Sequence, residues 1–297
     1  MTERSDQIDA TPRRRVRAVA VLPSLLTLGN LLCGFAAVFY ASRRFTPDDS
    51  TTYVLGHWTP LTISAVLVFV GMIFDCLDGW VARLTRSFSD LGEQLDSMAD
   101  MITFGLAPAF LMLQLADIRT PFVGSETTDT YLGRAVLLIA GIYVACCALR
   151  LARFNIEASK HDDNERSNGH EAFSGLPSPG AAGTVAAIVM LHQYHWGDHP
   201  ASTAALVTTA TMVAITLAVA LAMVSRLPYS HVVNRHLRNR APFHYIVIII
   251  LVVALSWLQF QTSLAIGFVI YAVSAPLGVV YRRLRHRGGG GDRDDQP

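Results

Sequence analysis

Long apolar blocks separated by short polar or charged segments make up most of the chain. The blocks are roughly 16 to 25 residues long, close to the ~20 residues that cross a bilayer as an α-helix. We expect a helix in each of eight blocks: residues 18–41, 61–83, 95–116, 132–154, 176–193, 202–224, 243–258 and 262–281. The sequence therefore predicts an all-α fold, a polytopic transmembrane helical bundle of about eight spans.

Composition supports a membrane protein and says little about partners. Of the 297 residues, 52% are hydrophobic and 16% are charged, whereas soluble domains average about 25% charged residues. The net charge is +1, and we expect no nucleic-acid partner. The expected organisation is a basic cytoplasmic segment (1–17), one membrane domain (18–281) and a disordered polar tail (282–297).

The distribution of basic residues predicts how the spans are oriented. With the N-terminus inside, most of the 24 Lys and Arg residues fall in the inner segments, and the outer segments keep only Arg43, Arg44, Arg119 and Arg134. Inner loops of membrane proteins carry an excess of Lys and Arg. We therefore expect a multi-pass protein of the cell (cytoplasmic) membrane with both termini facing the cytoplasm.

Negative charge gathers where the second predicted span ends and the third begins, in FDCLDGWVARLTRSFSDLGEQLDSMAD (74–100). Helical spacing places two sets of these residues on one face each: Asp75, Asp78, Gly79 and Ala82 in the second span, and Gly92, Asp96 and Asp100 in the third. If the two helices run antiparallel, both faces meet near the inner membrane surface. Asp90 and Glu93 are better explained as solvated loop charges.

Four carboxylates at close range repel one another and need compensation. Their oxygens suit hard divalent cations such as Mg²⁺, Mn²⁺ or Ca²⁺, and four of them can hold two ions roughly 4 Å apart, ready to bind a diphosphate. The small residues Gly79, Ala82 and Gly92 leave room for a ligand beside the backbone. Arg83 can pair with a phosphate through its forked guanidinium. A charged loop without a ligand is the alternative, and the regular spacing argues against it.

The same stretch resembles the CDP-alcohol phosphotransferase family, whose signature is D-x2-D-G-x2-A-R-x8-G-x3-D-x3-D. Every fixed position of the signature is matched, by Asp75, Asp78, Gly79, Ala82, Arg83, Gly92, Asp96 and Asp100. The resemblance implies a six-helix membrane core, here followed by a C-terminal hairpin. It also implies an enzyme that cleaves a CDP-linked lipid, releases CMP and joins the phosphatidyl group to an alcohol.

The resemblance further implies a role for each matching residue. Asp75, Asp78, Asp96 and Asp100 would bind two divalent cations, Mg²⁺ or Mn²⁺, and Asp100 would also be the general base. The CDP part of the lipid would contact Gly79, Ala82, Arg83, Ser89, Gly92, Thr27 and Asn30. Thr27 precedes Asn30 here, the reverse of the order in many family members.

Other stretches resemble one branch of this family, the bacterial-type phosphatidylserine synthases. They are LPSLLTLGNLLCG (22–34), QLDSMADMITFGLAPA (94–109), ALRLARFN (148–155), FSGLPSPGAAG (173–183) and MVSRLPYSH (223–231). This branch implies CDP-diacylglycerol and L-serine as substrates and a homodimer in the lipid membrane. Within RLARFN, Arg150, Arg153 and Asn155 become candidates for the serine pocket. The two arginines are alternatively anchors that extend to the lipid headgroups.

Several alternatives stay open at this point. Another acceptor of the same family (glycerol 3-phosphate, an inositol phosphate or choline) is compatible with the basic residues, and nothing distinguishes an ester from an ether lipid. A cation-coupled transporter is a different class, but its site is expected near the bilayer midplane, not at the inner ends of spans. His192, His195 and His199 are a weaker metal candidate in an outer segment.

Overall fold

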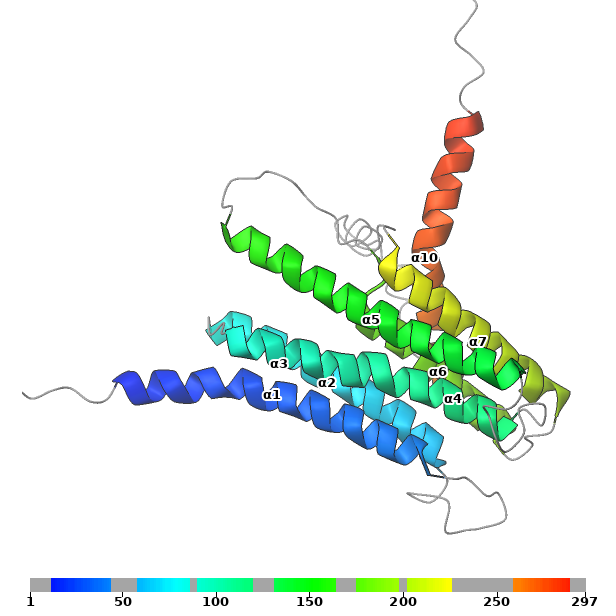
Figure 1. Cartoon of the computed structure of the whole chain (residues 1–297), viewed down its shortest axis with the longest axis horizontal. Coiled ribbons are helices and arrows are strands. Elements are labelled where there is room, and N and C mark those ends of the chain that lie inside the picture. Colours follow the sequence, from blue (N-terminus) through cyan, green and yellow to red (C-terminus); the bar gives the residue numbers. More distant parts are fainter. Residues whose placement is uncertain are drawn as a thin grey trace, which may run out of the picture.

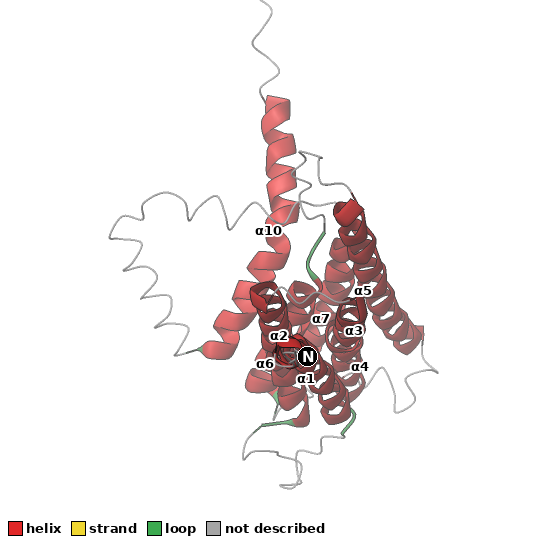
Figure 2. Ribbon diagram, turned by 90° about the vertical axis from the view of Figure 1, so that its left-hand side faces the viewer, coloured by secondary structure: helices red, strands yellow, loops and turns green. Residues whose placement is uncertain are grey.

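The computed structural model describes residues 12–43, 58–85, 90–119, 131–163, 175–197, 202–225 and 259–288. The elements are α1 (Pro12–Ala41), α2 (Pro60–Thr85), α3 (Asp90–Asp100), η2 (Met101–Leu106), α4 (Ala107–Arg119), α5 (Tyr131–Asp163), α6 (Ser178–Trp196), α7 (Thr203–Val224) and α10 (Phe260–Gly288). The helices from α1 to α7 lie alongside one another, and α10 crosses them at a steep angle (Figures 1 and 2). The all-α prediction is confirmed for the described residues.

Five described stretches are long and apolar enough to cross a membrane: Leu22–Ala41, Pro60–Thr85, Leu91–Ala116, Tyr131–Ile156 and Thr203–Val224. They coincide with the first four predicted spans and the sixth, so the chain is a multi-pass membrane protein. The predicted span 243–258 lies outside the described residues. α10 carries a shorter apolar stretch, Phe260–Ser274, and continues to Gly288, past the expected boundary at residue 281. The total of eight spans stays a prediction.

Helix α6, the fifth predicted span, lies in the interior of the bundle. Nearly all of its residues from Ser178 to Gln193 are buried, as expected for a helix that is apolar all round. Its glycines admit aromatic rings from α10. A Cβ atom at Gly180 would lie 2.7 Å from Cε1 of Tyr271, and one at Gly183 would lie 2.6 Å from Cζ of Phe268. These close approaches fix α10 against α6.

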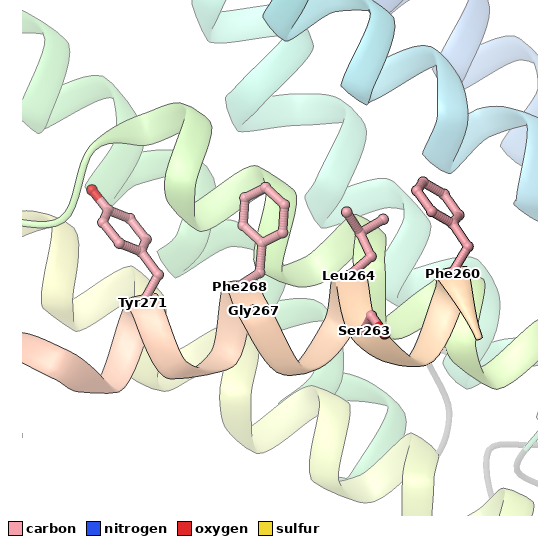
Figure 3. Close-up of a pocket in the computed structure, with 6 residues that line it drawn as sticks. All are labelled: Phe260, Ser263, Leu264, Gly267, Phe268 and Tyr271. Carbon is pink, nitrogen blue, oxygen red and sulfur yellow. The ribbon is translucent and has the colours of Figure 1, made fainter. Parts of the chain in front are cut away.

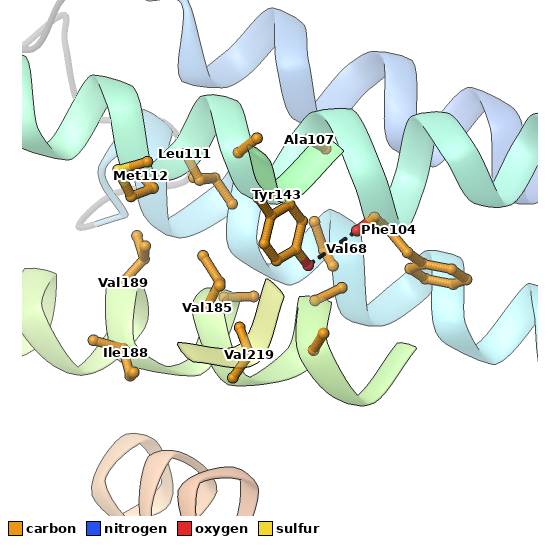
Figure 4. Close-up of a cluster of buried hydrophobic side chains, with 14 of the residues drawn as sticks. Val68, Phe104, Ala107, Leu111, Met112, Tyr143, Val185, Ile188, Val189 and Val219 are labelled. Carbon is orange, nitrogen blue, oxygen red and sulfur yellow. Dashed lines mark hydrogen bonds between the residues drawn. The ribbon is translucent and has the colours of Figure 1, made fainter. Parts of the chain in front are cut away.

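A hydrophobic core joins the helices on one side of the acidic residues. Its buried side chains include Val68, Phe104, Leu111, Met112, Tyr143, Val185, Val189 and Val219 (Figure 4). They come from α2, η2, α4, α5, α6 and α7. Burial of apolar surface on this scale is the main source of cohesion between side chains in water. In a bilayer, where lipid is equally apolar, close packing takes over that role.

The third predicted span is one continuous helical stretch, α3–η2–α4, with a π-helical segment immediately after Asp100. Two buried hydroxyls bond to backbone carbonyls there. Thr103 Oγ1 donates to the carbonyl of Asn30 in α1 over 2.9 Å. Tyr143 in α5 donates to the carbonyl of Phe104 over 3.1 Å (Figure 4). π turns are rare and concentrate at functional sites, and this one is tied to both neighbouring helices.

Glycines let α1 and α2 approach the π-helical segment closely. A Cβ atom at Gly34 of α1 would lie 2.9 Å from both N and Cα of Thr103, and one at Gly71 of α2 would lie 2.5 Å from its Cγ2. Both distances are shorter than real Cβ contacts, so only glycine fits at either position. The three helices that carry the acidic residues and their partners thus meet at Thr103.

Replacing Gly34 by alanine should therefore destabilise the bundle. The new methyl group meets backbone atoms that cannot rotate away, and overpacking of this kind costs about 1–3 kcal/mol. We expect a fall of several degrees in the thermal unfolding midpoint in detergent. Gly141→Ala is the matched control, because a Cβ there meets nothing within 4 Å. An unchanged midpoint for Gly34→Ala would contradict the close approach at Thr103.

Candidate active site

Carboxylates from two helices come together at one end of the bundle. Asp75 and Asp78 come from α2 and Asp96 from α3, and one oxygen of each lies within 4.8 Å of the other two. Asp78 is buried, whereas Asp75 and Asp96 are partly buried. The two acidic faces predicted from helical spacing do meet. We call these three residues the acidic cluster.

Helix α1 packs against both α2 and α3 and supplies hydrogen bonds to the acids. Thr27 Oγ1 donates to Oδ2 of Asp78 over 2.9 Å, and Asn30 Nδ2 donates to Oδ1 of Asp100 over 3.0 Å. Thr27 and Asn30 are both buried, one helical turn apart on one face. The sequence suggested them as nucleotide contacts. The structure shows that each holds a carboxylate, a contact between residues far apart in sequence that helical spacing cannot reveal.

Asp100 lies beside the acidic cluster but outside its group of three close oxygens. It is 9% exposed and interacts electrostatically with Asp75, Asp96 and Asp78. The bond from Asn30 occupies Oδ1. This position, beside the acidic cluster and bonded from α1, suits a residue that exchanges a proton.

The donor set of the acidic cluster fits a divalent cation. It consists of carboxylate oxygens, which hard cations such as Mg²⁺, Mn²⁺ and Ca²⁺ prefer. Among the described residues, Oδ1 of Asp96 is buried with no hydrogen-bond partner. A buried carboxylate oxygen without a partner is costly, and a cation would satisfy it. The cluster is therefore able to hold a divalent metal ion.

The predicted contacts to the CDP group lie around this cluster. Gly79, Ala82 and Gly92 are partly buried, and Arg83 is exposed. A Cβ atom at Gly79 would be 3.9 Å from Nη2 of Arg83, so the guanidinium lies over the small residue next to Asp78. Ser89 lies outside the described residues. The roles of these residues in binding stay predictions.

The two candidate arginines of α5 differ in their surroundings. Arg150 is partly buried and donates from Nη1 to Oγ of Ser178 over 2.6 Å. It also interacts electrostatically with Asp100 and Asp75. Arg153 is exposed. Only Arg150 of this pair is therefore directed into the bundle beside the acids.

Two serines near the site were missed by the sequence analysis. Ser97 of α3 bonds to Asn155, which donates from Nδ2 to Ser97 Oγ over 2.8 Å, and so joins α3 to α5. Ser178 accepts from Arg150 at the start of α6. A lone serine at the start of a helix usually indicates only a cap. For Ser178, the only sequence signal of a role at the site was its position within the stretch FSGLPSPGAAG.

Comparisons with known proteins identify the family. A sequence model of the CDP-alcohol phosphatidyltransferases matches residues 20–224, which contain the acidic cluster, Asp100 and Arg150. The chain belongs to this family. The last described helix, α10, lies outside the matched region.

Relatives with assigned names share this region. CDP-diacylglycerol–serine O-phosphatidyltransferase of Bacillus subtilis is 36% identical over 159 residues, covering 53% of this chain and 69% of the relative. The Helicobacter pylori (strain 26695) protein of the same name is 33% identical over 182 residues, covering 61% and 62%. Archaetidylserine synthase of Methanothermobacter thermautotrophicus is 30% identical over 184 residues, covering 61% and 63%. The matches thus span about two thirds of each relative.

Metal binding can be tested without measuring catalysis. A cation that binds the folded state raises its unfolding midpoint, so Mn²⁺ should stabilise the purified protein. In Asp96→Asn the neutral amide removes one ligand charge. With Mn²⁺ at about 100 times the wild-type Kd, a Kd raised roughly tenfold lowers RT ln(1 + [L]/Kd) by about half, and we expect at least that loss of stabilisation.

The matched control is Glu93→Gln, which removes an exposed carboxylate from the same helix. It should keep the full response to Mn²⁺. Equal responses to Mn²⁺ in wild type, Asp96→Asn and Glu93→Gln would exclude Asp96 as a ligand.

Proposed function

We propose that this chain transfers the phosphatidyl group of CDP-diacylglycerol to L-serine, giving phosphatidylserine and CMP in phospholipid synthesis. The observation that carries the proposal is the meeting of Asp75, Asp78 and Asp96 within 4.8 Å, at positions that all match the family signature. The names of relatives at 33–36% identity support serine as the acceptor.

In this reaction the serine hydroxyl attacks the phosphorus that carries diacylglycerol. A bond forms between that phosphorus and the serine oxygen, the bond to the CMP oxygen breaks, and CMP leaves with the electron pair. The hydroxyl is a poor nucleophile at neutral pH, so a base within hydrogen-bond reach is needed. We assign this role to Oδ2 of Asp100, because Asn30 holds Oδ1 and thereby orients the carboxylate.

Asp75, Asp78, Asp96 and Asp100 would hold two divalent cations, Mg²⁺ or Mn²⁺. When bound, such ions neutralise the diphosphate and the negative charge that develops on the leaving group. Thr27 orients Asp78 through its 2.9 Å hydrogen bond. Gly79, Ala82 and Gly92 leave space for the CDP group, and Arg83, with Ser89, would contact its phosphates.

The acceptor would bind on the α5 side of the site. Arg150 interacts electrostatically with Asp75 and Asp100, and a guanidinium pairs well with the serine carboxylate. Asn155 is tied to Ser97 on α3 and would close this side of the pocket. Arg153, which is exposed, would serve at its rim.

The location and assembly of the chain follow from the same proposal. The excess of basic residues in alternate segments supports the cell (cytoplasmic) membrane, with the site and both termini on the cytoplasmic side. Large apolar side chains such as Leu32, Phe35 and Leu138 are exposed on the helices and would face lipid. The branch resemblance supports a homodimer within the membrane.

The first test is release of CMP by detergent-purified protein supplied with CDP-diacylglycerol and Mn²⁺ or Mg²⁺. L-serine, glycerol 3-phosphate, inositol phosphate and choline are compared in parallel. We expect release that depends on serine and is lost on adding a chelator. Release with another acceptor would keep the family and overturn serine as the substrate. Folded protein that releases no CMP with any acceptor would overturn the enzymatic proposal.

Replacing Asp100 by asparagine tests the general base. The amide is similar in shape but cannot take a proton, and loss of a general base lowers turnover by about 10²- to 10⁴-fold. We expect that loss in kcat, while binding of CDP-diacylglycerol in the presence of Mn²⁺ changes little. Turnover close to wild type would exclude Asp100 as the base.

A further inference from the structure

Tyr271 belongs to α10, outside the region that the family model matches. Its side chain projects from the same side of α10 as those of Phe260, Leu264 and Phe268 (Figure 3). These four residues help to line a pocket of about 530 Å³ along the helix. Tyr271 supplies the one phenolic hydroxyl of this set, so its role is not explained by apolar packing alone.

Contacts with α6 fix the position of Tyr271. The ring lies against Gly180, where a Cβ atom would come 2.7 Å from Cε1. One turn away, the Phe268 ring lies against Gly183 and packs on Phe69 of α2, with ring centroids 5.6 Å apart. Oγ1 of Thr184 in α6, which donates to the carbonyl of Gly180 over 2.8 Å, also lies 3.4 Å from the carbonyl oxygen of Phe268. The register of α10 on α6 is therefore set at several points.

That register brings Tyr271 to the site. Gly180 is two residues from Ser178, whose Oγ accepts the 2.6 Å hydrogen bond from Arg150. Tyr271 and Arg150 interact electrostatically, and Arg150 interacts in turn with Asp75 and Asp100. The guanidinium of Arg150 thus donates to Ser178 and interacts with both Tyr271 and the carboxylates.

We propose that Tyr271 is a positioning residue for the acceptor pocket. Together with Ser178 it holds the Arg150 guanidinium toward the acids, where Arg150 binds the carboxylate of the acceptor amino acid. The inference rests on the proposed function. If it holds, α10 helps to determine the affinity for the acceptor, although α10 lies outside the residues that the family model matches.

The test compares Tyr271→Phe with wild type in the CMP-release assay, using L-serine and CDP-diacylglycerol with Mn²⁺. The change removes only the hydroxyl and keeps the ring against Gly180. We expect KM for serine to rise about three- to tenfold, the size of the net contribution of one typical hydrogen bond. The kcat and the KM for CDP-diacylglycerol should stay within about twofold, since Tyr271 acts through Arg150 on the acceptor alone.

Two further variants sharpen the test. Tyr131→Phe is the matched control, because Tyr131 is 90% exposed at the start of α5, and it should leave both KM values unchanged. Gly180→Ala displaces the Tyr271 ring while keeping its hydroxyl. It should raise KM for serine in the same direction as Tyr271→Phe.

The outcomes separate this inference from the proposed function. Wild-type protein without serine-dependent CMP release would overturn the proposed function. An active wild type, with KM for serine unchanged in Tyr271→Phe, would overturn only the role of Tyr271. Equal losses in kcat/KM for both substrates with a lower unfolding midpoint would show a structural role for Tyr271, and would also overturn the inference.

Discussion

Repulsion among carboxylates is the constraint on which this site depends. Two unit charges about 5 Å apart repel by roughly 3 kcal/mol at an effective dielectric constant near 20. Asp75, Asp78 and Asp96 form three such pairs, so their repulsion approaches the ~5–15 kcal/mol by which typical domains are stable. A fold that keeps these residues charged and together needs positive compensation. Divalent cations would supply it at the point where a diphosphate substrate would arrive.

Hydrogen bonds and close packing from neighbouring helices hold the acidic residues in place against this repulsion. Helix α1 holds Asp78 through Thr27 and Asp100 through Asn30. The backbone of Asn30 is itself bonded by Thr103, and glycines in α1 and α2 bring both helices onto Thr103. Since Thr103 follows Asp100 by less than one turn, the same contacts fix the α3 acids. The π-helical segment belongs to this arrangement, because it places Thr103 where all three helices meet.

Helical spacing predicted how the acidic residues meet better than it predicted the contacts that hold them. Regular spacing was enough to place Asp75, Asp78 and Asp96 on faces that meet, because helical geometry translates spacing directly into direction. The contact of Thr27 with Asp78 joins residues 51 positions apart, and no local pattern encodes it. Periodicity likewise assigned Arg150 and Arg153 to one face, yet Arg150 is partly buried against Ser178 whereas Arg153 is exposed. A π turn leaves no mark on apolar periodicity, so η2 was not foreseen.

These contacts suggest different roles for α10 and for residues 20–224, which the family model matches. The acids, their α1 partners and Arg150 all lie within residues 20–224, and these residues would handle what every substrate of the family shares, a diphosphate and a leaving CMP. In the proposed function the acceptor binds on the α5 side, so structure added there could act without disturbing the acidic cluster. α10 meets that condition. It packs on α6 and, through Phe268, on Phe69 of α2, and its Tyr271 interacts with Arg150. In the proposed role, a change at Tyr271 would alter the setting of that one guanidinium, while the carboxylates keep their hydrogen bonds from α1.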